Sequence, residues 1–246
     1  MTGTAKMILE IADLNKNFGG LRAVDGLTFQ VNEGEILGLL GPNGSGKTTL
    51  FNLITGVYTA DSGNIRFRSQ DITNARSYKI ALMGVSRTFQ STKVFHTQTV
   101  LDNIATAMIA RARKRHISVT RQKVAEVLDF AHLDKVKNAI AGDLTHAEQR
   151  RLMVAMALVE DPELLLLDEI TAGMSGEECN EMIEMAKQIR DRGTTIVLIE
   201  HNMRVAMSLS DRVIVLNFGK IIAEGKPEEI TKNEIVLEAY LGREEV

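Results

Sequence analysis

Short apolar runs of strand length recur along the chain. Residues 7–18 (MILEIADLNKNF) and 27–41 (LTFQVNEGEILGLLG) alternate or cluster apolar positions and predict strands. Residues 163–169 (ELLLLDE) and 194–202 (TTIVLIEHN) are continuous apolar runs, which are typical of strands buried on both faces.

Two further segments carry strand and turn signals together. Residues 61–73 (DSGNIRFRSQDIT) predict a turn followed by an exposed strand. Residues 212–225 (RVIVLNFGKIIAEG) predict a hairpin with Gly219 in its turn.

Helical patterns separate these runs. The first two cover residues 100–133 and about 145–160. The third is an amphipathic stretch at 176–193, which Gly193 ends, and the fourth is a charged tail at 227–246. Strands alternate with helices at both ends of the chain, which predicts a mostly parallel α/β sheet. The helical middle is then an insertion into that sheet.

Composition excludes several classes of protein. The 246 residues are 44% hydrophobic and 25% charged, with a net charge of −3, so nothing global indicates a nucleic-acid partner. Cys179 is the only cysteine and is expected to be an inert thiol on a helix, in a reducing compartment. We expect no signal peptide and no membrane span, because no apolar run is long enough. A function at a membrane would need another chain to supply the membrane part.

Residues 41–48 (GPNGSGKT) match the P-loop pattern in full, between a predicted strand and a predicted helix. In such a loop, backbone N–H groups surround the phosphates of a nucleotide, and glycine permits the close approach. Lys47 would reach the β- and γ-phosphates, and the Thr48 hydroxyl would bind Mg²⁺. The predicted nucleotide contacts here are Gly41, Pro42, Asn43, Gly44, Ser45, Gly46, Lys47, Thr48 and Thr49.

The ends of the two buried strands carry the remaining polar chemistry. Asp168 suits the Mg²⁺ shell, because Mg²⁺ keeps waters and takes few carboxylates. Glu169 is placed to polarise an attacking water. His201 ends a strand about 30 residues later, where a parallel neighbour would bring it to the phosphate face as a sensor of the γ-phosphate.

Residues 143–156 (DLTHAEQRRLMVAM) open a helix. Thr145 and Glu148 have the spacing of a capping box, which stabilises a helix by about 1 kcal/mol. A helix N-terminus is also an anion site, so the same residues could form half of a nucleotide site. The two interpretations are compatible.

Taken together, the P-loop, "RTFQ" (87–90), this helix start before "LLLLDE" and the strand-end histidine resemble an ABC-type ATPase subunit along nearly the whole chain. The resemblance implies a P-loop NTPase core with an antiparallel β subdomain and an inserted helical subdomain. By this resemblance the chain is a single domain, 1–246, with four parts. These are the antiparallel β and P-loop part at about 1–90, the helical subdomain at about 91–160, the continued core at about 161–225 and the C-terminal helical tail at about 226–246. The resemblance also implies head-to-tail dimers with two ATP molecules between the subunits.

The same resemblance assigns further roles. Phe18 would stack on adenine, and Gln90 would touch Mg²⁺ or the attacking water and sense a membrane partner. Residues 171–175 (TAGMS) would cross the dimer interface. The family signature, usually Leu-Ser-Gly-Gly-Gln, is here Leu144 to Glu148. Its nucleotide-facing residues would be Thr145, His146, Ala147 and Glu148.

The signature departs from the usual form in ways that weaken a phosphate site. His146 and Ala147 replace glycines, so the backbone approaches a phosphate less freely. Glu148 replaces a neutral amide and adds a like charge, which a protonated His146 would partly offset. A second departure, Ile170 in place of proline, carries no strong inference. This chain's own P-loop, Asp168, Glu169 and His201 are intact, so only a site that uses its signature would be weakened. We therefore expect a dimer with unequal sites if the partner is a different ATPase subunit. A homodimer stays open.

Within the ABC family, five stretches are similar to the ATPases for uptake of branched-chain (hydrophobic) amino acids or a related small solute: 14–56, 85–104, 164–178, 196–230 and 236–242. The resemblance implies ATP and Mg²⁺, a second ATPase subunit, transmembrane permease subunits and, indirectly, a solute-binding protein, with the chain on the cytoplasmic face of the membrane. Three alternatives remain: a lipid-exporter ATPase, a soluble ABC ATPase for iron–sulfur assembly, and a regulatory subunit that binds ATP but scarcely hydrolyses it.

Overall fold

Two sheets form the framework of the computed structural model, which describes residues 6–88, 93–115 and 121–241. The first is antiparallel, in the order β2-β1-β4-β5. Its strands are β1 (Met7–Phe18), β2 (Leu21–Asn32), β4 (Ser62–Phe67) and β5 (Gln70–Asp71).

The second sheet has the order β10-β9-β3-β8-β7-β6 and is parallel except for the edge strand β10. Its strands are β3 (Ile36–Leu40), β6 (Val85–Arg87), β7 (Leu164–Asp168), β8 (Thr195–Ile199), β9 (Arg212–Asn217) and β10 (Lys220–Gly225). This confirms the expected parallel core and the hairpin at Gly219.

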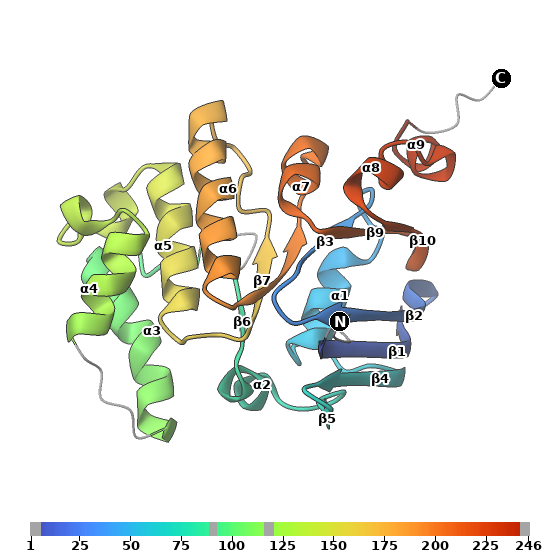
Figure 1. Ribbon diagram of the computed structural model, residues 1–246. Coiled ribbons are helices and arrows are strands. Elements are labelled where there is room, and N and C mark those ends of the chain that lie inside the picture. Colours follow the sequence, from blue (N-terminus) through green and yellow to red (C-terminus); the bar gives the residue numbers. More distant parts are fainter. Residues whose placement is uncertain (1–5, 89–92, 116–120, 242–246) are drawn as a thin grey trace, which may run out of the picture.

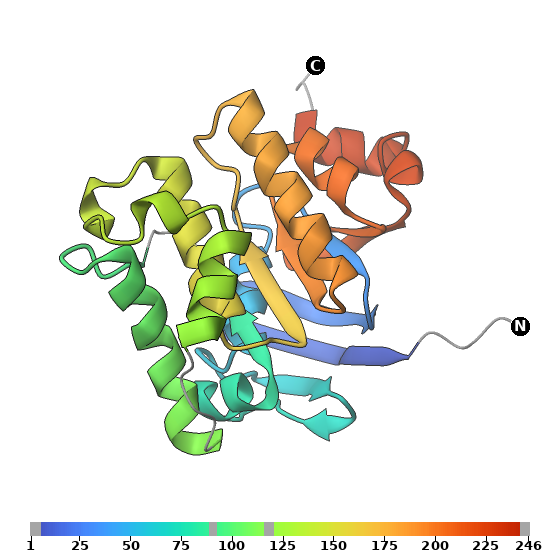
Figure 2. The same cartoon turned by 60° about the vertical axis from the view of Figure 1, so that its left-hand side comes forward.

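Helices connect and cover the sheets. They are α1 (Lys47–Ile54), α2 (Ser77–Met83), α3 (Val100–Arg115), α4 (Arg121–Phe130), α5 (His146–Leu158), α6 (Gly176–Asp191), α7 (Met203–Leu209), α8 (Pro227–Ile230) and α9 (Glu234–Leu241), with 3₁₀ turns at Asp134–Val136 and Ala141–Asp143. Helices α3, α4 and α5 gather at one end of the molecule and the antiparallel sheet lies at the other, with the parallel sheet between them (Figure 1). Figure 2 shows the same grouping after rotation.

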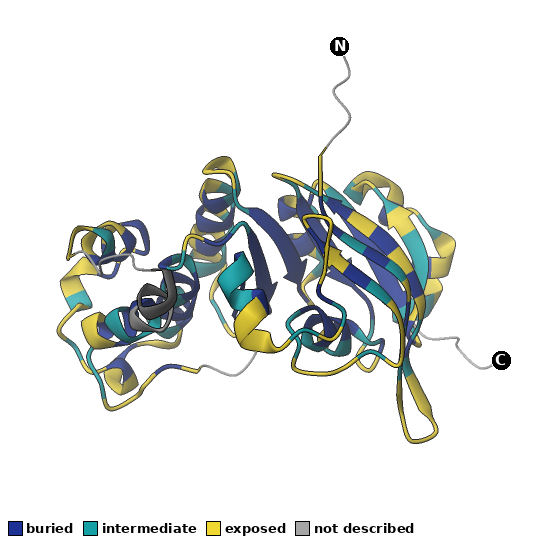
Figure 3. Ribbon diagram, turned by 90° about the horizontal axis from the view of Figure 1, so that it is seen from below, coloured by how far each residue is buried: buried dark blue, intermediate teal, exposed yellow. Residues whose placement is uncertain are grey.

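The central strands are buried on both faces, as their continuous apolar runs predict (Figure 3). Alternate residues point to opposite faces, so each strand feeds two cores. Leu165, Leu167 and Leu198 join the helical cluster that contains α5, α6 and α7. Leu164 and Leu166 join the cluster of α1 and the antiparallel sheet. The parallel sheet therefore ties the helical subdomain to the β subdomain.

Two sequence expectations need correction. The run at 27–41 is not one strand, because Gly34 at φ +78° turns the chain and Glu35 accepts a hydrogen bond from the Asn32 N–H at 2.7 Å. The strand at 61–73 is not simply exposed, because Ile65 and Phe67 are fully buried on one face of β4. Helix α2 and strand β6 had no clear periodicity in the sequence. Among the described residues, no helix is long and apolar enough to cross a membrane.

Candidate functional site

The P-loop connects β3 to α1, as predicted. Helix α1 begins after Gly46, whose φ of +105° lies in the left-handed region that favours glycine. A Cβ at Gly46 would lie 2.4 Å from the carbonyl oxygen of Ala23, and one at Gly41 would lie 2.1 Å from that of Leu216. Both glycines are therefore required by close backbone packing, and the loop is held against β2 and β9.

Lys47 lies at the centre of this loop and is buried. Its Nζ donates hydrogen bonds to the carbonyl oxygens of Gly41 at 2.7 Å and Pro42 at 3.0 Å. Burial lowers the pKa of Lys47, while the charges of Glu169 and Asp168 raise it. The ammonium group is thus placed in the loop next to the acidic ends of β7, as a phosphate-binding lysine requires.

Asp168 ends β7 and is almost fully buried. Its Oδ2 pairs with a guanidinium nitrogen of Arg87 at 2.8 Å, and its N–H donates to the Thr88 hydroxyl at 3.0 Å. Burial raises the pKa of Asp168, and Arg87 opposes that shift. Oδ1 is buried and has no hydrogen-bond partner among the described residues. A buried carboxylate oxygen without a partner fits a cation site.

Glu169 follows in the left-handed region at φ +51°, where residues other than glycine are strained. Its N–H donates to the Ile199 carbonyl at 2.9 Å, which fixes this turn to the end of β8. Its Oε1 lies 2.6 Å from Nε2 of His201. The parallel pairing of Asp168 with Ile199 brings the two side chains together, as the spacing predicted.

Glu200 is a residue of this site that the sequence did not single out. It is 2% exposed, and its Oε1 accepts hydrogen bonds from both the N–H and the hydroxyl of Thr171 at 3.0 Å. Burial raises the pKa of Glu200, and the Thr171 hydrogen bonds oppose this. Glu200 therefore joins the segment after Glu169 to the segment that carries His201. An acid inside the apolar run at 194–202 was the available signal.

Arg150 is a second residue of this site that the sequence did not single out. It lies on α5, in the helical subdomain, and is 6% exposed. Burial lowers its pKa, while the charges of Glu169, Glu200 and Asp168 raise it. Arg150 thus brings a positive charge from the helical subdomain to the acidic end of the parallel sheet.

The opening of α5 is a complete capping box. The Glu148 N–H donates to the Thr145 hydroxyl at 3.3 Å, and the Thr145 N–H donates to the Glu148 carboxylate at 2.9 Å. Thr145 and His146 are exposed and Ala147 is buried. A Cβ at Gly173 would lie 3.4 Å from the His146 ring, so this helix start lies against segment 171–175. The cap is confirmed, and the nucleotide role stays a prediction.

The remaining predicted residues lie elsewhere. Phe18 ends β1, is 42% exposed and meets Tyr58 edge to face at 5.2 Å between ring centroids. It pairs with Leu21 at the turn into β2, the strand whose Ala23 touches the P-loop. An exposed aromatic surface beside the loop is suited to stacking on a base. Thr48 is exposed in the first turn of α1. Gln90 lies outside the described residues.

This fold and site define an ATP-binding cassette, and comparisons with known proteins agree. The family model described as ABC transporter matches residues 24–172, more than half of the chain. The model described as branched-chain amino acid ATP-binding cassette transporter matches residues 220–246. The chain belongs to the ABC transporter family.

Several relatives match over nearly their full length. The chain is 35% identical to the high-affinity branched-chain amino acid transport ATP-binding protein BraF of Pseudomonas aeruginosa, covering 97% of this chain and 99% of that protein. It is 38% identical to LivG of Escherichia coli, with the same description, covering 96% and 98%. A crystal structure of an ABC transporter cassette in its ADP conformation matches with a TM-score of 0.87 at 30% identity, covering 96% and 99%.

Replacing Arg87 with Met tests the ion pair with Asp168. The Asp168 carboxylate would stay buried without its partner, so we expect a loss of about 3–5 kcal/mol in the free energy of unfolding at pH 8. The raised pKa of Asp168 would rise further, and the folded chain would then bind more protons than the unfolded chain. Stability then falls as pH rises, so the loss should be smaller at pH 5. Urea unfolding at both pH values measures it.

Arg66→Met is the matched control, because Arg66 is half exposed and its contact with Glu10 is 3.6 Å long. We expect less than about 0.5 kcal/mol from it. Equal losses in the two variants, or a larger Arg87→Met loss at pH 5, would contradict the assignment.

Proposed function

We propose that this chain is the ATP-hydrolysing subunit of an importer for branched-chain or other hydrophobic amino acids, acting at the cytoplasmic face of the membrane. The observation that carries the enzymatic part is the meeting of Lys47, Asp168, Glu169 and His201 at the carboxyl ends of parallel strands. The descriptions of the relatives support the transported class.

The residues fit a magnesium ion. Asp168 offers a buried oxygen that has no hydrogen-bond partner in the part of the chain that the structure describes, and Thr48 is exposed in the first turn after the P-loop. Thr48 and Asp168 would hold the ion, with Gln90 as a further candidate ligand. When bound, Mg²⁺ neutralises charge that develops on the transferring phosphoryl group.

The chain's own residues then divide the remaining work. Backbone N–H groups of the P-loop bind the phosphates, and Phe18 stacks on adenine. Glu169 orients a water for in-line attack and accepts its proton, since its carboxylate is held at the strand end by the turn at φ +51°. Lys47 and His201 stabilise the phosphoryl group as it transfers. Nε2 of His201 lies 2.6 Å from Oε1 of Glu169, so the two side chains act on the phosphoryl group as a pair.

A groove between the two subdomains suits a membrane partner. It has a volume of about 320 Å³ and is lined mainly by apolar side chains of α2, β6, α3 and α5. Thr88 and Lys93, which flank segment 89–92 in the sequence, also line it. Because Arg87 and Thr88 line this groove and also contact Asp168, a helix of a permease subunit in the groove would be linked to the nucleotide site. Movement of the helical subdomain against the core would then be transmitted to the membrane.

A second ATPase subunit completes the enzyme. The start of α5 would close over the γ-phosphate held by the partner's P-loop. In this chain, the capping box already uses Thr145 and Glu148, so the closing surface binds phosphate weakly. We therefore favour a heterodimer with a different ATPase subunit over a homodimer.

Glu169→Gln is expected to keep Mg-ATP affinity within about 3-fold and to lower steady-state hydrolysis by at least about 10²-fold, because the general base is removed. Phosphate release and calorimetric titration measure the two effects. Glu184→Gln, an exposed residue on α6, is the matched control and should hydrolyse ATP normally. Normal turnover in Glu169→Gln would remove Glu169 from this role.

The solution mass of Glu169→Gln with Mg-ATP also separates a homodimer from a chain that needs another subunit.

In the Glu169→Gln background, adding His146→Gly and Glu148→Gln is expected to tighten ATP-driven pairing by roughly 10-fold. One like charge at about 10 Å and an effective dielectric of about 20 costs roughly 1.7 kcal/mol per unit phosphate charge. Glutamine still completes a capping box, so the helix should survive. Sedimentation equilibrium measures pairing, and circular dichroism checks the fold. Unchanged pairing in a stable variant would leave Thr145 and Glu148 as a cap alone.

Met156→Glu places a charge in the apolar groove and is expected to abolish copurification of the permease subunits from cells that express the whole transporter. Met7→Glu introduces the same residue at an exposed position of β1 and should leave copurification intact. Equal recovery of permease with both variants would exclude the groove as the docking site.

A further inference from the structure

The C-terminal helix contacts the P-loop. Tyr240, on α9, accepts a hydrogen bond at its hydroxyl oxygen from the N–H of Gly41 at 2.7 Å. The two residues are 199 positions apart in the chain. Nothing in the periodicity of the tail predicts this contact, because Tyr240 there looks like any apolar residue of an amphipathic helix.

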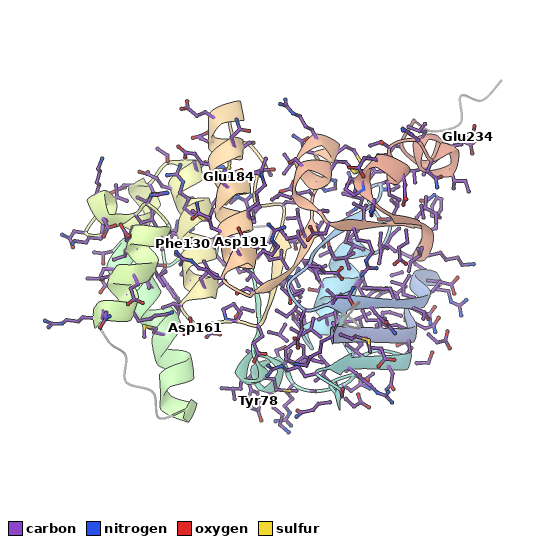
Figure 4. All side chains as sticks on the ribbon, in the orientation of Figure 1. Tyr78, Phe130, Asp161, Glu184, Asp191 and Glu234 are labelled. Carbon is purple, nitrogen blue, oxygen red and sulfur yellow. The ribbon has the colours of Figure 1, made fainter. Side chains whose placement is uncertain are left out.

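Helix α9 is fixed in place by its own packing. Val236 is 1% exposed and belongs to a cluster with Leu40 of β3 and residues of β9. The Asn233 side chain caps the helix by accepting hydrogen bonds from the N–H groups of Ile235 at 3.0 Å and Val236 at 3.3 Å. Figure 4 labels Glu234 at the start of this helix, which contacts β10. The Tyr240 hydroxyl is therefore presented to the P-loop by a docked element.

Gly41 is the residue at which the strand becomes the loop. The parallel pairing of β3 with β9 ends at Leu40 and Val215, so the buried Gly41 lies beyond the ladder. Its N–H is satisfied by Tyr240, and its carbonyl oxygen accepts from Lys47. A buried N–H without a partner is costly, so the hydroxyl fixes the first peptide of the loop.

We propose that Tyr240 is a positioning residue for nucleotide binding, whose hydroxyl holds the Gly41 peptide so that the P-loop keeps its phosphate-binding shape. The inference rests on the proposed binding of ATP at this loop. When Lys47 leaves the Gly41 carbonyl for the phosphates, the loop loses one of its two anchors at this residue. The Tyr240 hydrogen bond is the anchor that remains.

The chemistry of the phenol suits this role. Burial raises the pKa of Tyr240, so the hydroxyl stays neutral at physiological pH and adds no negative charge beside bound phosphates. Residues 220–246, which match the family model for branched-chain amino acid cassettes, include Tyr240. The contact between Tyr240 and Gly41 joins that segment to the P-loop.

Tyr240→Phe removes only the acceptor oxygen and tests the proposal in the full chain. We expect the Kd and KM for Mg-ATP to rise about 3- to 10-fold while kcat stays within about 2-fold, as expected for a lost contribution to ground-state binding. Tyr78→Phe is the matched control, because Tyr78 is exposed on α2, far from α9 (Figure 4). It should change neither constant.

Amide hydrogen exchange at Gly41 gives a second readout, which the unmodified chain alone can contradict. In the unmodified chain this amide should be protected both without nucleotide and with Mg-ATP, and Tyr240→Phe should abolish that protection. Exchange at the rate of a free amide in the unmodified chain would overturn the proposal. Unchanged Mg-ATP affinity in a folded Tyr240→Phe protein would also overturn it. If the unmodified chain fails to bind Mg-ATP, the proposed function itself fails.

Discussion

The dominant constraint in this molecule is the neutralisation of charge at the carboxyl end of the parallel sheet. Asp168 and Glu200 are each no more than 2% exposed, and Glu169 is 8% exposed. Such carboxylates are stable in a fold only beside cations or hydrogen-bond donors. Lys47 comes from the P-loop, Arg87 from β6 and Arg150 from the helical subdomain. Three parts of the chain are therefore held together by the charges that meet at the proposed nucleotide site.

The backbone conformations of Glu169 and Gly41 fit that arrangement. Glu169 adopts φ +51° because its N–H bonds to the end of β8 while its side chain turns toward His201. Gly41 is required by the carbonyl of Leu216, and its N–H is held by Tyr240. At both of these residues, strain or close approach occurs at the point where a strand ends and the site begins. The buried strands behind them supply the rigidity that makes this possible.

Local patterns in the sequence were enough to predict the P-loop, the buried strands and the capping box of Thr145, because each depends on neighbours in the chain. The approach of His201 to the β7 end was predictable because parallel strands align their carboxyl ends. The partners Arg87, Arg150 and Tyr240 were not predictable, since they come from distant segments and have no signature in spacing. Residues 27–41 form two strands because one hydrogen-bonded turn joins Asn32 and Glu35. The clustering of apolar residues in this run does not indicate that turn.

The start of α5 shows how one helix terminus serves two competing demands. A cap satisfies the first N–H groups within the chain, whereas a phosphate site needs them free to face a ligand. Here Thr145 and Glu148 satisfy each other, and the Glu148 carboxylate already offsets the positive end of the helix. The stability of this helix is therefore gained at the expense of its capacity to bind an anion. In the proposed ATPase dimer, such a capped helix start would therefore be best complemented by a partner subunit whose own helix start is open.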